Sequence, residues 1–405
     1  QGIGTSGIRL FTSASGSAIE RFRISSDGSL STPTLGTSNV RFGVNAGNSI
    51  VSGGTFNTLV GDGAGTAITT GDENTAIGRN SLGTATTAQY NTVVGSGAGY
   101  ATTTGNSNIA MGVNALVANT TGTQNTALGT FSLDANTTAS NNTAVGYKAL
   151  TTNTTGANNT SVGRHALYAN TTGIKNTAVG TSALIGNTTG GTNTAIGWSA
   201  GSAITTGQGN LCIGYTAGNY QASLTTGTGN VLVGPYCDAV SATADQQHCF
   251  GYNIDATSGY TTLGAGSSSI RAAFGNTTWS TVSDERYKKD IVDSTAGLSF
   301  INALQPRTWN YRTLGELPET FNAYEEGSTE VFKNTQTNHG FIAQEVKAAI
   351  DADDSIKDGF RLWDDREDGS QEVAEAALIP VLTKAIQELS AQVDALTARI
   401  ETLEG

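Results

Sequence analysis

Long apolar runs, proline and aromatic residues are all scarce in this sequence. No stretch of about 18 consecutive apolar residues occurs, so we expect no transmembrane helix and no insertion into a membrane, and no secretory signal peptide is recognisable. Only 5 of the 405 residues are proline, and none falls between 34 and 234, which argues against a proline-rich disordered linker there. The chain begins with Gln1 instead of Met, which suggests a fragment or a processed form.

Side chains that bind metals are also few. The three cysteines have neither metal-ligand nor redox spacing, so we expect free and mostly small apolar side chains. They are Cys212, Cys237 and Cys249. Two acidic stretches, 351–354 and 364–369, lack the calcium-loop pattern, because the first has no glycine at its sixth position and Arg366 interrupts the second. We interpret both as solvated loops and expect no metal and no cofactor.

Positive charge is scarce throughout, and negative charge is concentrated at one end. The sequence has 9 acidic and 9 basic residues before residue 283, and 24 acidic and 12 basic residues from there onward. The whole net charge of −12 therefore belongs to the last third of the chain. Because no basic face is available, binding to nucleic acid is not expected.

Glycine, threonine and asparagine are abundant, and they recur with a strict period. A unit that begins with asparagine and has glycine at its fifth position repeats every 17 residues, in nine equal steps. The units begin at Asn57, Asn74, Asn91, Asn108, Asn125, Asn142, Asn159, Asn176, Asn193 and Asn210. Asn39 stands 18 residues before this series and Asn230 stands 20 residues after it. Equal spacing indicates an array of repeated structural units.

Each unit combines a short strand with turn residues. Its first four residues suit a strand, the glycine that follows marks a tight turn or a close backbone approach, and the Asn-Thr-Thr-Gly stretch is typical of turns. We expect the branched residue at the fourth position to face a core. These residues are Val60, Ile77, Val94, Met111, Leu128, Val145, Val162, Val179, Ile196, Ile213 and Val233. One unit has too few apolar side chains to fold alone, so stacked repeats or interleaved chains must complete the core.

The repeats predict a mainly β fibre, with a lead-in at 1–38, a shaft of 17-residue repeats at 39–234 and a β connector at 235–282. The alternative, a disordered polar tether, requires neither strict spacing nor a fixed apolar position. The pattern resembles the β-roll and β-helical head repeats of trimeric fibres, which occur in phage tail fibres and in bacterial trimeric adhesins. Further short strands are expected at 21–25 (with a turn at 26–28), 261–264 and 270–275.

Helical periodicity appears after residue 283 and predicts a small α+β domain at 283–405. Ile291, Leu298, Ile301 and Leu304 indicate a helix that ends before Pro306. A strand is expected at 308–312, a polar loop at 313–337, a helix opened by 340–346 and continuing to about residue 350, an acidic loop at 351–371, and a long terminal helix.

The terminal helix carries a heptad pattern at about 379–404. Its apolar residues alternate in steps of 3 and 4, which is typical of a coiled-coil seam. They are Ile379, Leu382, Ile386, Leu389, Val393, Leu396, Ile400 and Leu403. Packing on its own domain and pairing into a dimer are alternatives. A trimeric fibre upstream would override the dimer preference of this seam, so we expect three strands.

The segment 283–291 lies at the change of composition and contains a serine and a lysine five residues apart, Ser283 and Lys288. A serine hydroxyl becomes a nucleophile when a base removes its proton, and a desolvated lysine can be that base. Such Ser-Lys dyads are a known variant of the catalytic triad. Spacing alone is weak support for catalysis, and it leaves Lys289 open as the base.

Four motifs give the region from about 275 to 404 a resemblance to the peptidase S74 family, the C-terminal intramolecular chaperone of phage tail spikes and fibres. The motifs lie at 283–291, 304–306, 340–346 and 378–389. The resemblance implies that the domain trimerises, helps the upstream fibre fold and then cleaves itself once in cis. It also implies Ser283 as nucleophile, Lys288 as general base and Asp284 as the flanking residue. We favour cleavage of the Ser283–Asp284 bond, although an N-to-O acyl shift would break Val282–Ser283 instead.

The resulting hypothesis is a homotrimeric tail fibre of a virion, made in the host cytoplasm and bound to other tail proteins. It would attach to a host surface receptor, either a glycan or an outer-surface protein. The rivals are a trimeric cell-surface adhesin, which is expected to end in a membrane anchor, and the shaft of a tail-spike glycosidase whose catalytic part lies upstream. Some variable positions could contact a receptor, although isolated surface side chains are the preferred interpretation. They are Phe131, Tyr147, Arg164, His165, Trp198 and Tyr215.

Overall fold

The chain forms two compact units, Gln1–Ser283 and Asp284–Gly405, in a computed structural model. The structure describes residues 8–13, 18–24, 30–31, 36, 38–276, 279–281, 283–354, 356, 360, 362–365 and 369–404. Within these residues, no helix combines the length and the apolar character needed to cross a membrane.

A small antiparallel sheet opens the first unit. It consists of β1 (Ile8–Ser13), β2 (Ala18–Ile24) and β3 (Leu30–Ser31), with β2 in the middle. The strand predicted at 21–25 coincides with the end of β2. The turn predicted at 26–28 lies outside the described residues.

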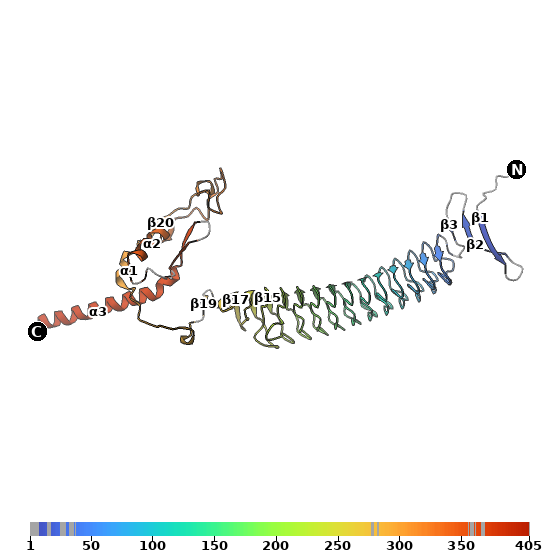
Figure 1. Ribbon diagram of the computed structural model, residues 1–405, viewed down its shortest axis with the longest axis horizontal. Helices are drawn as coiled ribbons and strands as arrows, with labels where there is room; N and C mark the ends of the chain where they lie inside the picture. Colours follow the sequence, from blue (N-terminus) through green and yellow to red (C-terminus); the bar gives the residue numbers. More distant parts are fainter. Residues whose placement is uncertain are drawn as a thin grey trace. The chain divides into compact units, whose positions relative to one another are not determined.

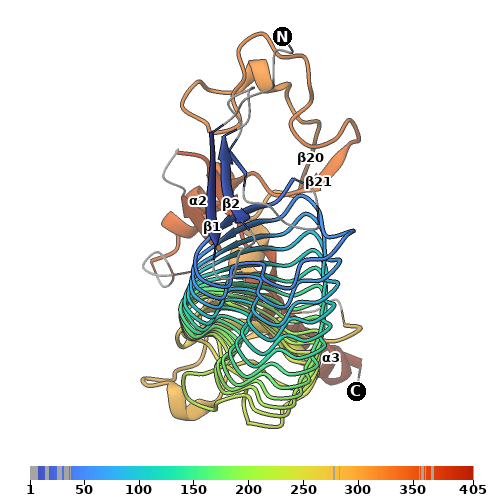
Figure 2. The same ribbon diagram turned by 90° about the vertical axis from the view of Figure 1, so that its right-hand side faces the viewer.

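The shaft is a β-solenoid with one short strand in each coil, which confirms the predicted repeat fibre (Figure 1). From β4 to β17, every strand is parallel to the next one and pairs with it residue by residue, as Thr143 does with Thr160. One 17-residue repeat is therefore one coil, and viewed end-on the coils follow one another closely (Figure 2).

The strands of the repeats are three residues long and occupy the second to fourth positions of each unit. They are β4 (Val40–Phe42), β5 (Thr58–Val60), β6 (Thr75–Ile77), β7 (Thr92–Val94), β8 (Ile109–Met111), β9 (Thr126–Leu128), β10 (Thr143–Val145), β11 (Thr160–Val162), β12 (Thr177–Val179), β13 (Thr194–Ile196), β14 (Leu211–Ile213) and β15 (Val231–Val233).

The prediction that the fourth position faces the core of the coil is wrong. From β5 to β15 the middle residue of each strand is buried, whereas the apolar residue after it lies on the outer face, where Met111 is 45% and Ile196 is 40% exposed. Successive strand residues point to opposite faces, so only one residue of three can point inward. In half of the strands from β4 to β15 that residue is alanine, as at Ala144, because the leucine of the following turn, such as Leu150, already fills the interior.

Buried asparagines connect one coil to the next. The Oδ1 atom of Asn142 accepts the backbone N–H of Asn159 at 2.9 Å. The Nδ2 of Asn159 in turn donates to the carbonyl of Gly173, also at 2.9 Å. The same arrangement recurs from coil to coil and satisfies backbone groups that no strand partner reaches. It gives the first residue of the repeat its structural role.

The glycine after each strand is required by the stacking of the coils. Gly146 has φ +134°, and a Cβ atom there would lie 2.7 Å from the carbonyl oxygen of Gly163 in the next coil. No larger side chain fits at that distance, so the glycine reflects a close backbone approach.

Three longer strands and a short one close the shaft. β16 (His248–Tyr252) and β17 (Tyr260–Ala265) continue the parallel stack, and β18 (Ser268–Ala273) and β19 (Ser280–Thr281) turn back antiparallel. β17 and β18 confirm the strands predicted at 261–264 and 270–275.

The second unit is the small α+β region that the sequence predicts. Its helices are η1 (Glu285–Tyr287), α1 (Leu298–Ala303), η2 (Leu314–Glu316), α2 (Ala343–Asp351), η3 (Glu375–Ala377) and α3 (Leu378–Glu404). Its strands form two antiparallel pairs, β20 (Arg307–Trp309) with β21 (Asn338–Gly340) and β22 (Trp363–Asp365) with β23 (Gln371–Val373).

The core of this unit is built by Phe300 of α1, Val346 and Ile350 of α2, and Val381 of α3. The helix predicted from Ile291 begins only at Leu298, and Asp290 ahead of it has φ +56°, a left-handed conformation that interrupts a helix.

Two other predictions for this unit need correction. The strand predicted at 308–312 is shorter and ends at Trp309. The acidic loop predicted at 351–371 contains β22 and the first residue of β23, because Trp363 and Val373 pack on the core.

Candidate functional site

The predicted cleavage segment lies where the two compact units divide. Ser283 is the last residue of the first unit and Asp284 is the first residue of the second. Ser283 is exposed, and Asp284 is half-buried. The bond between them therefore belongs to neither hydrophobic core.

Asp284 determines the local geometry of the segment by capping the single turn η1. One of its oxygens accepts the backbone N–H of Arg286 at 2.9 Å. The guanidinium of Arg286 folds back and binds both carboxylate oxygens, at 2.9 and 2.6 Å. The side-chain and backbone hydrogen bonds from Arg286 hold the pKa of Asp284 below its usual range. The carboxylate thus stays charged and keeps the turn closed.

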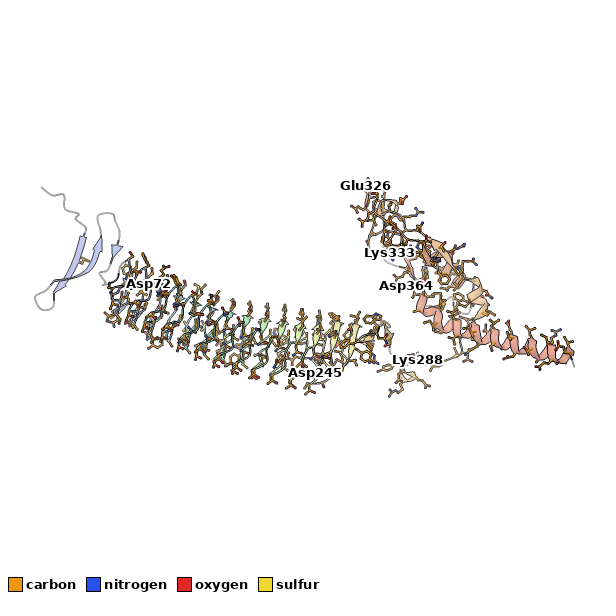
Figure 3. The ribbon with its side chains drawn as sticks, turned by 180° about the vertical axis from the view of Figure 1, so that it is seen from behind. Asp72, Asp245, Lys288, Glu326, Lys333 and Asp364 are labelled. Atoms are coloured by element: carbon orange, nitrogen blue, oxygen red, sulfur yellow. The ribbon has the colours of Figure 1, made fainter. Side chains whose placement is uncertain are left out.

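Lys288 follows directly after this turn and is held by its backbone. Its N–H donates to the carbonyl of Glu285 at 2.8 Å, and its side chain is exposed (Figure 3). Lys289 is exposed as well. In the sequence, the turn η1 thus lies between Ser283 and Lys288, and a second lysine, Lys289, follows directly.

Exposed apolar side chains flank the two lysines in the sequence. Tyr287 is 80%, Ile291 63% and Val292 84% exposed. A lysine acts as a base when its ammonium group loses contact with water. A partner surface that covered these three residues would supply such an environment.

The residues after the cleavage segment are tied to the terminal helix. The backbone N–H of Leu298, the first residue of α1, donates to Oε2 of Glu388 on α3 at 2.8 Å. A bidentate ion pair between Arg307 and Glu345, at 3.0 and 2.8 Å, joins β20 to α2. The start of α1 is therefore positioned by α3, the element that carries the predicted seam.

Helix α3 presents two apolar faces, of which its own domain covers one. Leu378, Val381 and Ala385 are buried. The eight residues of the predicted seam are all exposed, by 43 to 78%. The seam lies on one uninterrupted helix of 27 residues, so nothing in the helix disturbs the heptad.

The cysteines are free, as predicted. Cys212, Cys237 and Cys249 are buried inside the solenoid, and burial raises the pKa of Cys212 to about 12. Among the residues that the structure describes, no three His, Cys, Asp or Glu side chains gather in a way that could hold a metal ion.

The interpretation of the variable aromatic residues as isolated side chains is wrong. The rings of Trp198 and Tyr215 are stacked at 4.9 Å, and Tyr147 contacts the rings of Phe131 and His165. The sequence carries a signal for the first pair, because residues 17 apart occupy equivalent positions in successive coils. Sequence reasoning missed Tyr220 and Tyr236, which join the same group.

Residues 283–354 match the family model of peptidase S74, described as the chaperone of endosialidase. The match begins at Ser283 and spans the segment from η1 to α2. It contains three of the four motifs, at 283–291, 304–306 and 340–346, and so confirms the predicted resemblance, while the motif at 378–389 lies outside the match. The family description implies an intramolecular chaperone with self-cleavage activity. No protein of curated function and no solved structure matches the chain significantly.

Proposed function

We propose that the chain is a homotrimeric tail-fibre shaft whose C-terminal unit directs assembly and then releases itself by cleavage at Ser283. One observation carries the proposal: the chaperone match begins at Ser283, and the two compact units divide between Ser283 and Asp284. A cut at this point separates the units without opening either core.

The cleavage uses the hydroxyl of Ser283, the amine of Lys288 and one water molecule. Lys288 takes the hydroxyl proton of Ser283 while Oγ bonds to a backbone carbonyl carbon. The amide nitrogen then leaves with a proton, so that an ester replaces the peptide bond. Water hydrolyses the ester, which restores the hydroxyl and leaves a free carboxylate. Asp284, held by Arg286, fixes the turn between nucleophile and base.

Ring size distinguishes the two candidate bonds. Attack of Oγ on the carbonyl of the preceding residue closes a five-membered ring and breaks Val282–Ser283, where Val282 lies outside the described residues. Attack on the carbonyl of Ser283 itself would close a strained four-membered ring. Cleavage of Ser283–Asp284 is therefore easier when the hydroxyl comes from Ser283 of a neighbouring copy, and it would link cleavage to assembly.

The exposed seam of α3 supports self-association of the second unit. Eight large apolar side chains at heptad spacing are unusual on the surface of a monomer. Parallel packing of identical helices buries such a seam as knobs in holes. We propose three copies, because a fibre with three chains upstream would set the number of helices.

The outer face of the shaft sheet supports the same assembly. The branched residues at the strand ends form a continuous apolar row from Val60 to Val233, and each is half-buried or exposed. Side-by-side packing of three identical shafts would cover this row along its whole length. We propose that other copies of this chain cover the row, because an identical array repeats with the same spacing.

A folding chaperone would help the shafts of such a fibre to associate in the correct register. Because identical coils can pair in any register, three shafts risk association with a shift of one or more repeats. A coiled coil forms from local contacts, brings three chains together and raises their effective concentration. Cleavage afterwards makes the correctly paired shaft kinetically stable, because the unit that directed assembly is gone.

Attachment to a host completes the proposal. A virion tail fibre presents its shaft to the cell surface, binds other tail proteins at its opposite part, and is made in the host cytoplasm. The low charge of the shaft, with 9 acidic and 9 basic residues before residue 283, suits a rod that remains after the acidic part has left.

The test is gel electrophoresis and mass spectrometry of the expressed full chain. We expect the wild type to yield two fragments and Ser283→Ala to remain full length and trimeric. Ser280→Ala, three residues away in β19, is the matched control and is expected to cleave normally. A folded wild-type chain that stays intact contradicts the proposal. The new N-terminus, Ser283 or Asp284, identifies the bond.

Co-expression of two chains of different length tests the origin of the hydroxyl. When a tagged Ser283→Ala chain is assembled with the wild type, cleavage of the tagged chain shows attack between copies. Cleavage of the wild-type chain alone shows attack within one chain.

A further inference from the structure

Five aromatic side chains form one continuous group on the outside of the shaft between β13 and β16. The ring planes of Trp198 and Tyr215 stack with an angle of 13° between them. Tyr236 lies 5.3 Å from Tyr215 and 5.8 Å from Tyr252, measured between ring centroids. Tyr220 joins Tyr236 at 4.7 Å. Tyr236 is half-buried in the centre, and the four rings around it are exposed.

An insertion in the repeat builds part of this aromatic group. The step from Asn210 to Asn230 is 20 residues instead of 17, and the additional length forms the loop that carries Tyr220. The fully buried Asp238 binds the backbone of this loop. Its Oδ2 accepts the backbone N–H groups of Tyr220 and Ala222, at 3.1 and 2.8 Å, and that of the residue between them. The position of Tyr220 is therefore fixed before any ligand arrives.

The backbone of Tyr236 also departs from what its side chain prefers. Its φ is +57°, in the left-handed region. The equivalent positions of earlier coils share this conformation, with residues as different as Asn80 (φ +55°), Phe131 (φ +58°) and Thr216 (φ +51°). The left-handed backbone at Tyr236 therefore belongs to the coil.

The chemistry of the group fits a neutral sugar. The apolar C–H face of a pyranose ring packs on an exposed indole or phenol ring, and tyrosine hydroxyls can bind the sugar hydroxyls. No lysine or arginine occurs between Lys175 and Arg271, so the region offers no cation for an acidic sugar.

We propose that Trp198, Tyr215, Tyr220, Tyr236 and Tyr252 form a binding platform for a neutral, hexose-containing surface polysaccharide. The inference rests on the proposed role in host attachment and gives that role a site. Contact between copies does not explain the platform, because the apolar row on the sheet runs from Val60 to Val233, whereas these aromatic residues occur only near its end.

Binding of the assembled protein to immobilised dextran, mannan and galactan tests the platform, with hyaluronate and polygalacturonate as acidic comparators. We expect binding to at least one neutral polysaccharide and to neither acidic one. Trp198→Ala and Tyr236→Ala should each weaken it roughly tenfold, which is the loss of one stacked ring. Tyr90→Ala is the control, because Tyr90 is an exposed aromatic residue of another coil and is 55% exposed.

The outcomes separate this inference from the proposed function. Binding that is unchanged in Trp198→Ala and Tyr236→Ala, absent from every neutral polysaccharide, or stronger for the acidic ones overturns the platform. Loss of the trimer in Trp198→Ala, seen by sedimentation, also overturns it, because the group would then be a contact between copies. Cleavage at Ser283, followed by gel on the same preparations, reports on the proposed function independently of the sugar.

Discussion

Asp284 is the residue on which the shape of the cleavage segment depends. Its carboxylate binds the backbone and the guanidinium of Arg286 and so closes η1 between Ser283 and Lys288. These bonds need the charged carboxylate, because a protonated acid is a weaker acceptor. The turn should therefore respond to pH, although Arg286 is exposed and Asp284 is only half-buried.

The sign of this pH dependence follows from the lowered pKa of Asp284, caused first by its side-chain hydrogen bond with Arg286. A carboxylate with a lowered pKa stabilises the folded turn above its unfolded pKa, and this stabilisation is lost as the pH falls through the folded value. We expect loss of the turn below about pH 4, the ordinary range of an aspartate. The carboxyl carbon of Asp284, followed by NMR, should titrate at lower pH in the folded protein than in a peptide of residues 283–291. Equal midpoints would contradict the predicted cap.

At the scale of the elements, buried asparagines stabilise the coils of the shaft in addition to their apolar interior. Asn142 accepts from Asn159 of the next coil and donates to Asn125 of the preceding one. Both bonds are buried, so a coil without the amide leaves a backbone N–H with no acceptor.

Asn142→Ala tests this role. We expect a loss of about 1–3 kcal/mol in the free energy of unfolding, which is the usual cost of an unsatisfied buried donor. The measurement is the midpoint of chemical denaturation followed by circular dichroism. Thr155→Ala in the same coil is the control, because Thr155 is exposed, and its effect should stay within about 0.5 kcal/mol. Equal effects of the two substitutions would count against the asparagine ladder.

The elements also show how far the sequence alone could lead. The 17-residue period predicts the solenoid, because equal spacing leaves stacking as the consistent solution. The prediction of which strand position faces the interior was wrong, because it took the bulky Val145 instead of the small Ala144 as the core residue. Alanine fits at the inward position because Leu150, six residues later, fills the interior of the coil. The alternation of residues within the strand does not reveal this packing.

The candidate site was predictable to a different degree. Ser283, Lys288 and the seam of α3 follow from motifs and heptad spacing, because both are local patterns. The aromatic platform was not predictable, since Tyr220 and Tyr236 depart from the spacing that relates Trp198 to Tyr215. Their proximity comes from the insertion after Asn210 and from the buried Asp238, which are properties of the folded chain.

At the scale of the whole molecule, assembly depends on the seam of α3 in this proposal. Ile386→Asp together with Leu389→Asp places two carboxylates in the seam, where burial of charge is costly. We expect loss of the trimer in sedimentation and a strong reduction of cleavage at Ser283. Gln387→Asp, on an exposed position of the same turn outside the seam, is the control and should assemble normally. A double variant that still forms trimers would remove the seam from the assembly mechanism.

Because all coils have the same form, the length of the shaft can change in fixed steps when repeats are gained or lost in the gene. Each strand contacts only the strand before it and the strand after it. Duplication or loss of one 17-residue unit therefore adds or removes one strand spacing, about 4.8 Å of rod, while both new junctions still match. Unequal recombination between nearly identical repeats produces such changes without a frameshift. We therefore expect the shafts of related proteins to differ in length by whole coils.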